Sequence, residues 1–101
     1  MYRGTTPTLT FTLPIEAASV TALNIALAQC RRVVISRSLE DVEADGNEIR
    51  ITLTEAETLA LHDGCDLSIQ LRVGVDETRM ASQIFKVPVD RILQEGKLDE
   101  L

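Results

Sequence analysis

Apolar and polar residues alternate along several short segments of the chain, and this two-residue period is typical of half-buried β-strands. In the clearest case, Ile49, Ile51 and Leu53 lie on one face and polar residues lie on the other. Pro7 and Pro14 bracket the first such segment and limit its length. The pattern predicts strands over residues 8–13, 20–28, 32–37, 49–53, 67–73 and 79–89.

The alternation stops after the fourth predicted strand, where the sequence has the features of a helix start. Thr54, followed three residues later by Glu57, forms a capping box, in which the two side chains bond free amides of the first helical turn. We therefore predict one short helix over residues 55–61. Leu59 or Leu61 would close one end of the core.

Short, regularly spaced strands without alternating helices predict an all-β fold. We expect an immunoglobulin-like β-sandwich of six to seven antiparallel strands with one short helix near 55–61, and a small open barrel is the alternative. The chain would be one domain, 1–101, with an extended lead-in (1–7), a helical turn at 92–93 and a frayed acidic tail (94–101). The alternating apolar residues form the expected core: Leu9, Phe11, Leu23, Ile25, Leu27, Ile35, Ile49, Ile51, Leu53, Leu67, Ile69, Leu71, Phe85 and Val87.

Composition narrows the range of functions. The 101 residues are 45% hydrophobic and 3% aromatic, and they carry a net charge of −6. This acidity argues against binding bulk nucleic acid, and so few aromatic side chains cannot form a stacking surface. No apolar run approaches the roughly 20 residues of a membrane-spanning helix, and the first residues contain no apolar signal core. We therefore expect no nucleic acid, no membrane and no signal peptide.

Charge is unevenly distributed along the chain. Residues 1–38 have a net charge of +3 and residues 39–101 a net charge of −9, which together give −6. One interpretation is a basic edge and an acidic edge suited to head-to-tail contact between subunits. The other is a set of acid-rich loops in solvent. Position in sequence does not fix position in space, so both stay open at this point.

One acidic segment follows the pattern of a calcium-binding loop. Asp41, Glu43 and Asp45 take its first, third and fifth oxygen positions, and Gly46 takes its glycine position. The twelfth position is Thr52, which cannot supply a bidentate carboxylate, and the flanks are predicted strands instead of helices. An acidic hairpin loop is therefore the favoured interpretation, and no metal site is predicted.

The chain has two cysteines, Cys30 and Cys65, and neither has a second Cys or His at metal-ligand spacing. Both lie at ends of predicted strands, so the fold could bring them together. Thiols in a chain without an export signal are usually reduced. We therefore expect free thiols, with a disulfide as the alternative.

No catalytic arrangement is predicted. His62 is the only histidine, and its chain neighbour Asp63 is poorly placed to orient it as a base. The sequence contains no Gly-x-Ser-x-Gly elbow and no phosphate-cradling glycine loop. Paired acids such as Glu55 and Glu57 lie in a helix cap without an aromatic sugar platform. We therefore expect that the protein is not an enzyme and uses no cofactor.

Several segments resemble small prophage-encoded proteins of Gram-positive bacteria. The resemblance is carried by residues 2–11 (YRGTTPTLTF), 27–29 (LAQ), 51–54 (ITLT), 69–73 (IQLRV) and 89–93 (VDRIL). These proteins are similar to the N-terminal, immunoglobulin-like domain of phage baseplate upper proteins, which continue into further segments. The resemblance therefore implies a free-standing adaptor or accessory module of a tail or baseplate.

The implied function is a non-enzymatic structural or interaction module of a prophage tail or baseplate, acting through strand edges and loops in protein–protein assembly. Its partners would be other tail or baseplate proteins, or further copies of itself. Its location would be the virion, or the bacterial host cytoplasm during assembly. The alternative is a bacterial adaptor or a carbohydrate-binding β-sandwich module.

The candidate contact residues lie in three places: the lead-in, a basic turn and the acidic segment. The lead-in would either lie across another subunit by strand addition or pack on its own sheet. The other two places would either bind a partner or face solvent. The residues are Tyr2, Arg3, Thr5, Thr6, Arg31, Arg32, Glu40, Asp41, Glu43 and Asp45.

Overall fold

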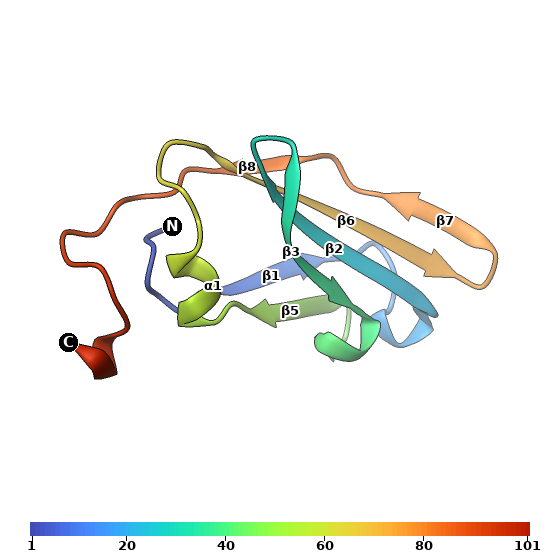
Figure 1. Cartoon of the computed structure of the whole chain (residues 1–101). Helices are drawn as coiled ribbons and strands as arrows, with labels where there is room; N and C mark the ends of the chain where they lie inside the picture. The colour runs from blue at the N-terminus through green and yellow to red at the C-terminus, as the bar shows by residue number, and fades with distance from the viewer.

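The computed structural model describes residues 1–101 as two antiparallel β-sheets packed face to face (Figure 1). The smaller sheet has the order β1-β5-β4, with β1 at Thr8–Thr12, β5 at Glu48–Thr52 and β4 at Glu43–Asp45. The larger sheet has the order β3-β2-β6-β7, and β8 also pairs with β6. Its bounds are β3 Arg32–Ser38, β2 Ala22–Gln29, β6 Leu67–Val75, β7 Thr78–Ala81 and β8 Phe85–Val87. The predicted all-β sandwich is confirmed at this level. The strand count of six to seven is wrong, because the structure has eight strands, among them the unpredicted β4.

The one α-helix, α1, spans Glu55–Leu59, and it ends two residues earlier than the prediction. Its capping box is formed as expected: the Glu57 amide donates to Thr54 Oγ1 at 3.1 Å, and the Thr54 amide donates to Glu57 Oε1 at 2.9 Å. Leu61, just beyond the helix, is the buried residue that closes the core. Three short 3₁₀ turns complete the chain: η1 at Ala17–Ser19, η2 at Leu39–Asp41 and η3 at Leu98–Glu100.

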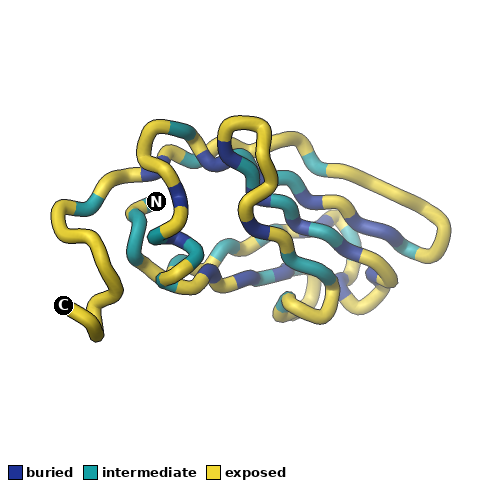
Figure 2. Tube along the Cα trace, in the orientation of Figure 1, coloured by how far each residue is buried: buried dark blue, intermediate teal, exposed yellow.

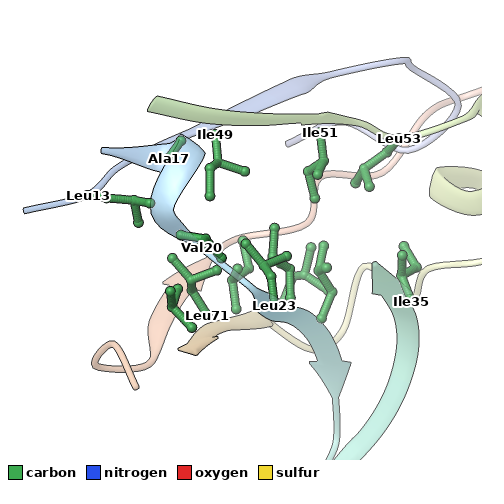
Figure 3. Packing of buried hydrophobic residues seen from close by; sticks show 14 of the residues in the cluster. Leu13, Ala17, Val20, Leu23, Ile35, Ile49, Ile51, Leu53 and Leu71 are labelled. Carbon is green, nitrogen blue, oxygen red and sulfur yellow. The ribbon is translucent and has the colours of Figure 1, made fainter. Parts of the chain in front are cut away.

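The core lies between the inner faces of the two sheets (Figure 3). Sheet pairing explains its composition, because Ile25 of β2 lies opposite Leu71 of β6 and both side chains point inward. Ten of the expected core residues are buried, from Leu23 to Leu71. Six further buried residues were not in the expected core list: Leu13, Ala17, Val20, Leu61, Val73 and Val89. Val73 lies within β6, and the others lie outside the strands, in turns and connections.

Four expected core residues are not buried, and all of them lie on two neighbouring edges of the sandwich. Leu9, Phe11 and Val87 are half-buried and pack against the core. Phe85 is 43% exposed, so its assignment to the core is wrong. The physical reason is that these strands are the last in their sheets, so no further strand covers their outer side.

The predicted strand over residues 79–89 is two strands, β7 and β8, separated at residues 82–84. Ser82 causes the break, because the Leu71 amide donates a hydrogen bond to the Ser82 Oγ at 3.0 Å instead of to a main-chain carbonyl. The Ser82 carbonyl accepts a bond from the Gln70 side chain at 3.1 Å. Pro88 directly follows β8 on this edge, as a residue without an amide hydrogen requires.

Both ends of the chain lie at the α1 end of the molecule (Figure 1). Tyr2 and Asp90 form a short parallel bridge, and the Asp90 amide donates to the Met1 carbonyl at 2.7 Å. The predicted helical turn at residues 92–93 is absent, and the tail has its only helical turn at η3. Exposed residues dominate the tail from residue 90 onward (Figure 2).

Candidate functional site

The lead-in, residues 1–7, packs on its own domain, and Arg3 is its anchor. The Arg3 Nε donates to the Leu61 carbonyl at 2.7 Å, and its guanidinium also bonds the Leu59 carbonyl and the carboxylate of Glu95. The Glu95 hydrogen bond raises the pKa of Arg3, and the same bond lowers the pKa of the Glu95 carboxyl. One side chain therefore ties the lead-in, the end of α1 and the tail together.

Thr5 is held by the helix in the same way. The Thr5 amide donates to Thr58 Oγ1 at 3.0 Å, and the Thr58 hydroxyl donates to the Thr5 carbonyl at 2.7 Å. Thr58 is fully buried. Of the four candidate contact residues in the lead-in, Tyr2, Thr5 and Thr6 are exposed and Arg3 is half-buried. Arg3 and Thr5 make hydrogen bonds within the chain.

The basic turn with Arg31 and Arg32 joins β2 to β3 and projects into solvent. Cys30 and Arg31 both have positive φ, at 50° and 67°, although neither is glycine. This backbone suits a two-residue hairpin, but it costs a side-chain-bearing residue about 1–2 kcal/mol. The turn is therefore strained unless other contacts hold it.

A disulfide between Cys30 and Cys65 holds the turn, so the expectation of free thiols is wrong. The two Cα atoms are 6.3 Å apart, within the range that a disulfide spans. Chain folding brings the β2–β3 turn against the loop between α1 and β6, and sequence spacing alone does not reveal this. The bond closes the end of the sandwich next to α1.

Gln29 reinforces the same junction, and the sequence analysis missed it. Its side chain donates to the carbonyls of His62 at 2.7 Å and Cys65 at 3.0 Å, and its Oε1 accepts from the His62 amide at 2.9 Å. Gln29 is buried. Its position was the available signal, because Gln29 lies two residues after Leu27 on the apolar face of β2. A polar side chain on that face is buried, and a buried amide needs hydrogen-bond partners.

The acidic segment consists of η2 and the β4–β5 hairpin, and its candidate residues Glu40, Asp41, Glu43 and Asp45 are all exposed. Asp41 caps η2, since its carboxylate accepts from the Ser38 amide and hydroxyl at 2.9 Å each. The hydrogen bond from the Ser38 backbone amide is the main reason that the pKa of the Asp41 carboxyl is lowered. The calcium-like pattern, residues 41–52, forms the β4–β5 hairpin. Its flanks are not both strands as predicted, because the pattern begins in η2 and α1 follows it.

The charge difference along the sequence is partly cancelled in space. Arg37 of β3 bonds Glu57 of α1 at 2.6 Å, and Arg3 pairs with Glu95. Two of the four bases in residues 1–38 are thus paired with acids from residues 39–101. Arg31 and Arg32 make no ion pair, so the basic character of the first segment is confined to the β2–β3 turn.

The two long sides of the sandwich differ. On one, here called the closed side, the chain itself crosses from β3 through η2 to β4 and joins the two sheets. Arg37 adds the bond to Glu57 and a longer one, 3.4 Å, to the Thr52 carbonyl at the end of β5. The edge strand β3 also has a bulge in its ladder with β2, where the register shifts between Leu27 and Ala28 of β2. Bulges and charged residues of this kind discourage further strand pairing.

The other long side, here called the open side, has β1 on one sheet and β7 and β8 on the other. A groove between them consists of two adjoining hollows of about 300 and 220 Å³. The two hollows share Thr12, Leu71 and Ser82. The other residues that line the first hollow are mostly apolar: Leu9, Thr10, Phe11, Ile69 and Phe85.

The outer edge of β1 has free main-chain groups. The Leu13 amide donates to the Asn47 carbonyl at 2.7 Å, and the Pro7 carbonyl accepts from the Leu53 amide at 3.0 Å. Both groups therefore point toward β5. In an antiparallel ladder alternate residues point their main-chain groups in opposite directions. The main-chain groups of Thr8, Thr10 and Thr12 therefore point outward, and β1 carries no charged side chain and no bulge.

Comparisons with protein-family models, with curated proteins and with solved structures find no match to the chain. No helix of the structure has the length and apolar character that crossing a membrane requires. The open side is thus the candidate functional site on structural grounds alone.

Proposed function

We propose that the chain is a non-enzymatic structural module that assembles with other proteins of a prophage tail or baseplate through its open side. The observation that carries the proposal is the free edge of β1 beside an apolar groove. A partner strand along Thr8–Thr12 would gain main-chain hydrogen bonds and bury Phe85 at the same time. The resemblance of residues 2–11 to baseplate-associated proteins supplies the biological setting.

The use of polar groups elsewhere in the molecule supports a binding role. Arg3, Arg37, Gln29 and Thr58 all make hydrogen bonds that hold the lead-in, α1 and the β2–β3 turn in place. These groups stabilise the domain. The open side offers both apolar side chains and free main-chain groups, and strand addition uses both.

We also propose that the sandwich is immunoglobulin-like. The short helix α1 lies between β5 of the smaller sheet and β6 of the larger sheet, and a crossing of this kind supports the assignment. The open barrel is the competing architecture. It requires strand pairing between β1 and β8, and an experimental structure with that pairing would overturn the proposal.

The proposed function is tested by mixing the purified protein with purified tail and baseplate proteins encoded next to its gene. Size-exclusion chromatography with light scattering measures whether a complex of defined mass forms. Phe85→Asp places a charge in the groove, and Val34→Asp is the matched control, because Phe85 is 43% exposed and Val34 on β3 is 44% exposed. We expect complex formation by the wild type and by Val34→Asp, and its loss in Phe85→Asp. No complex with any of these proteins contradicts the proposal.

A carbohydrate-binding module is the second candidate, and one observation favours it. Phe11 and Phe85, two of the three aromatic residues, line the same groove as the hydroxyls of Thr10 and Ser82. The lining contains no carboxylate or amide side chain, which makes the groove a better match for an apolar peptide. A glycan array decides between the two, since binding that Phe85→Asp abolishes would favour the carbohydrate.

A further inference from the structure

We propose that the outer face of the larger sheet binds the acidic segment of a second copy of this chain. This surface, here called the basic face, contains Arg72, Arg79 and Lys86. Phe85 and the groove lie on the opposite face of the same sheet, so the inference concerns a second surface and does not depend on the open side.

The larger sheet contains no acidic residue. Its five strands include five bases and no Asp or Glu, although the chain has sixteen acids. Two of these bases, Arg32 and Arg37, are in β3, and Arg37 points toward α1, where it pairs with Glu57. The other three bases are exposed and make no ion pair. The acidic protein therefore has one sheet with basic residues only.

Strand register places these three bases on one face. Even-numbered residues of β6 alternate with its buried apolar residues and therefore point outward. Arg72 is one of them, and Arg79 and Lys86 lie opposite two others, Gly74 and Ser68. The remaining residues of the face are small or neutral, so it has little relief: Ala22, Asn24, Ala26, Ala28, Ser36, Ser38, Gln70 and Ala81.

A hollow of about 240 Å³ on this face is lined by Arg72, Arg79 and Asn24. The Arg79 Nη1 donates to the Asp76 carbonyl at 2.7 Å, and a Cβ at residue 74 would collide with the same nitrogen. The Arg79 guanidinium is thus packed over Gly74 and held in place before a ligand arrives. A guanidinium binds a carboxylate through two parallel hydrogen bonds, so carboxylates are the groups that this hollow suits.

The acidic segment supplies such carboxylates. Residues 40–48 include five acids and no base. Glu43 and Asp45 are exposed on the edge strand β4 and, two residues apart, point to the same side. Glu43 has no ion pair, and Asp45 reaches only Arg50, at 3.6 Å.

Spacing matches as well as charge. Two residues of a strand span about 6.8 Å, which separates Glu43 from Asp45. Arg72 and Arg79 are diagonal neighbours on β6 and β7, and such neighbours lie about 7–8 Å apart. Two carboxylates of one copy can therefore meet two guanidiniums of the next.

The contact is between copies and can repeat. Within one copy, the acidic segment forms ion pairs only with Arg50 and none with the basic face. The basic face and the acidic segment are different surfaces, so each copy can bind one neighbour with each of them. Contacts of this heterologous kind build a ring or an open chain.

Sedimentation velocity at about 0.05 M and about 0.5 M salt tests the inference, because salt screens contacts between exposed charges. Arg72→Glu/Arg79→Glu reverses the charge of the basic face, and Glu43→Lys/Asp45→Lys reverses the charge of the acidic segment. We expect the wild type to associate at the lower salt concentration. Each variant should associate at least about tenfold more weakly.

The matched control is Arg31→Glu/Arg32→Glu. It changes the net charge by the same amount as the basic-face variant, but at an exposed turn at the other end of β2. The control should associate like the wild type, and thermal unfolding checks that each variant is folded. If the acidic-segment variant does not fold, the basic-face variant and its control decide the test.

A chain with both charge reversals gives the decisive result. Its acidic face and basic segment are again complementary, so it should associate like the wild type. A wild type that stays monomeric at the lower salt concentration, or an association that salt does not weaken, would overturn the inference. The same holds for a control that fails like the basic-face variant, a folded basic-face variant that associates like the wild type, or a folded doubly reversed chain that stays monomeric.

Poly-L-glutamate as a probe separates a second copy from other acidic partners. A monomeric wild type that binds this peptide through Arg72 and Arg79 would remove the second copy as the occupant and leave an acidic partner of another kind. Binding of tail proteins that Phe85→Asp abolishes and Arg72→Glu/Arg79→Glu leaves unchanged would support the open side alone. Failure of this inference and failure of the proposed function are therefore distinguishable.

Discussion

The closed and open sides of this sandwich contain the same kinds of strand but differ in what lies at their edges. On the closed side, the β3–η2–β4 connection joins the two sheets and the Arg37–Glu57 pair ties β3 to α1. The strand β3 also has a bulge in its ladder with β2. On the open side, nothing connects β1 to β7 and β8, and an apolar groove lies between them. Contacts that tie the chain together therefore gather on the closed side, and the open side is where we propose that a partner binds.

The two edge strands differ in how they are protected against further strand pairing. A free strand edge next to apolar side chains is a hazard for aggregation unless it is guarded. β3 is guarded by its bulge and by Arg32 and Arg37, whereas β1 has neither. An unguarded edge next to a groove is what a binding surface requires.

The largest expected effect is the loss of stability when a buried side chain is shortened, compared with the same change at a position that faces the groove. Ile51 and Leu9 are direct neighbours across the β5–β1 ladder, but Ile51 is buried and Leu9 is half-buried. Ile51→Ala should lower the free energy of unfolding by about 2–5 kcal/mol, because it leaves an enclosed cavity. Leu9→Ala should cost about 1 kcal/mol, because its site already opens into the groove. Urea denaturation measures both, and equal losses would contradict the distinction between the two sides.

The next largest change in stability is expected from removing the disulfide. Replacing both Cys30 and Cys65 with alanine should lower the free energy of unfolding by about 2–4 kcal/mol, because the unfolded chain regains the freedom that the closed loop removed. Urea denaturation of the variant and of the wild type with and without reductant provides the measurement. Reductant should destabilise the wild type and leave the double variant unchanged. A wild type insensitive to full reduction would show that the bond does not hold the turn.

A smaller change in stability is expected when the pH is lowered and the Arg37–Glu57 pair is lost. The hydrogen bond from Arg37 is the main reason that the pKa of Glu57 lies below its usual value, so the unfolded state binds more protons than the folded state near that value. The stabilisation is complete above about pH 4.3, the usual value for glutamate, and is lost as pH falls further. It should amount to about 1 kcal/mol or less.

The matched test compares unfolding of the wild type and Glu57→Gln at neutral pH and in acid. The difference between them should shrink as pH decreases through this range. A difference that stays constant would mean that the ion pair does not contribute to the closed side.

The smallest change in stability is expected from relieving the strain in the β2–β3 turn. Arg31→Gly should raise the free energy of unfolding by up to about 1 kcal/mol, because glycine adopts the positive φ of residue 31 without steric cost. The control is Arg32→Gly in the neighbouring strand position, which should destabilise instead. A loss of stability in Arg31→Gly would show that the side chain makes contacts that outweigh the strain.

Most of the strands, the capping box and most of the core could be predicted from sequence, because alternation and capping are local. The short strand β4 was missed, and β7 and β8 were predicted as one strand. Ile49 and Ile51 follow a strict two-residue period, and Thr54 with Glu57 has a fixed spacing. The edges could not be predicted in this way. Phe85 has the same alternation as a core residue, and only its place at the end of a sheet exposes it.

The long-range contacts were also beyond the reach of local patterns. The pairing of Cys30 with Cys65 and of Arg3 with Glu95 depends on how the chain ends and turns meet in space. The same is true of the open side, which combines β1 near the start of the chain with β7 and β8 near its end. Gln29 and Thr58 had weak signals as polar residues in apolar surroundings, and their roles required knowledge of their partners.

Amide hydrogen exchange in the free and the assembled protein tests the central claim most directly, namely that assembly uses the open side. The account predicts that the amides of Thr8, Thr10 and Thr12 exchange rapidly in the free protein and become protected on assembly. Amides on the free edge of β3 should exchange at the same rate in both states. Protection that appears along β3 while Thr8, Thr10 and Thr12 stay unprotected would contradict the account.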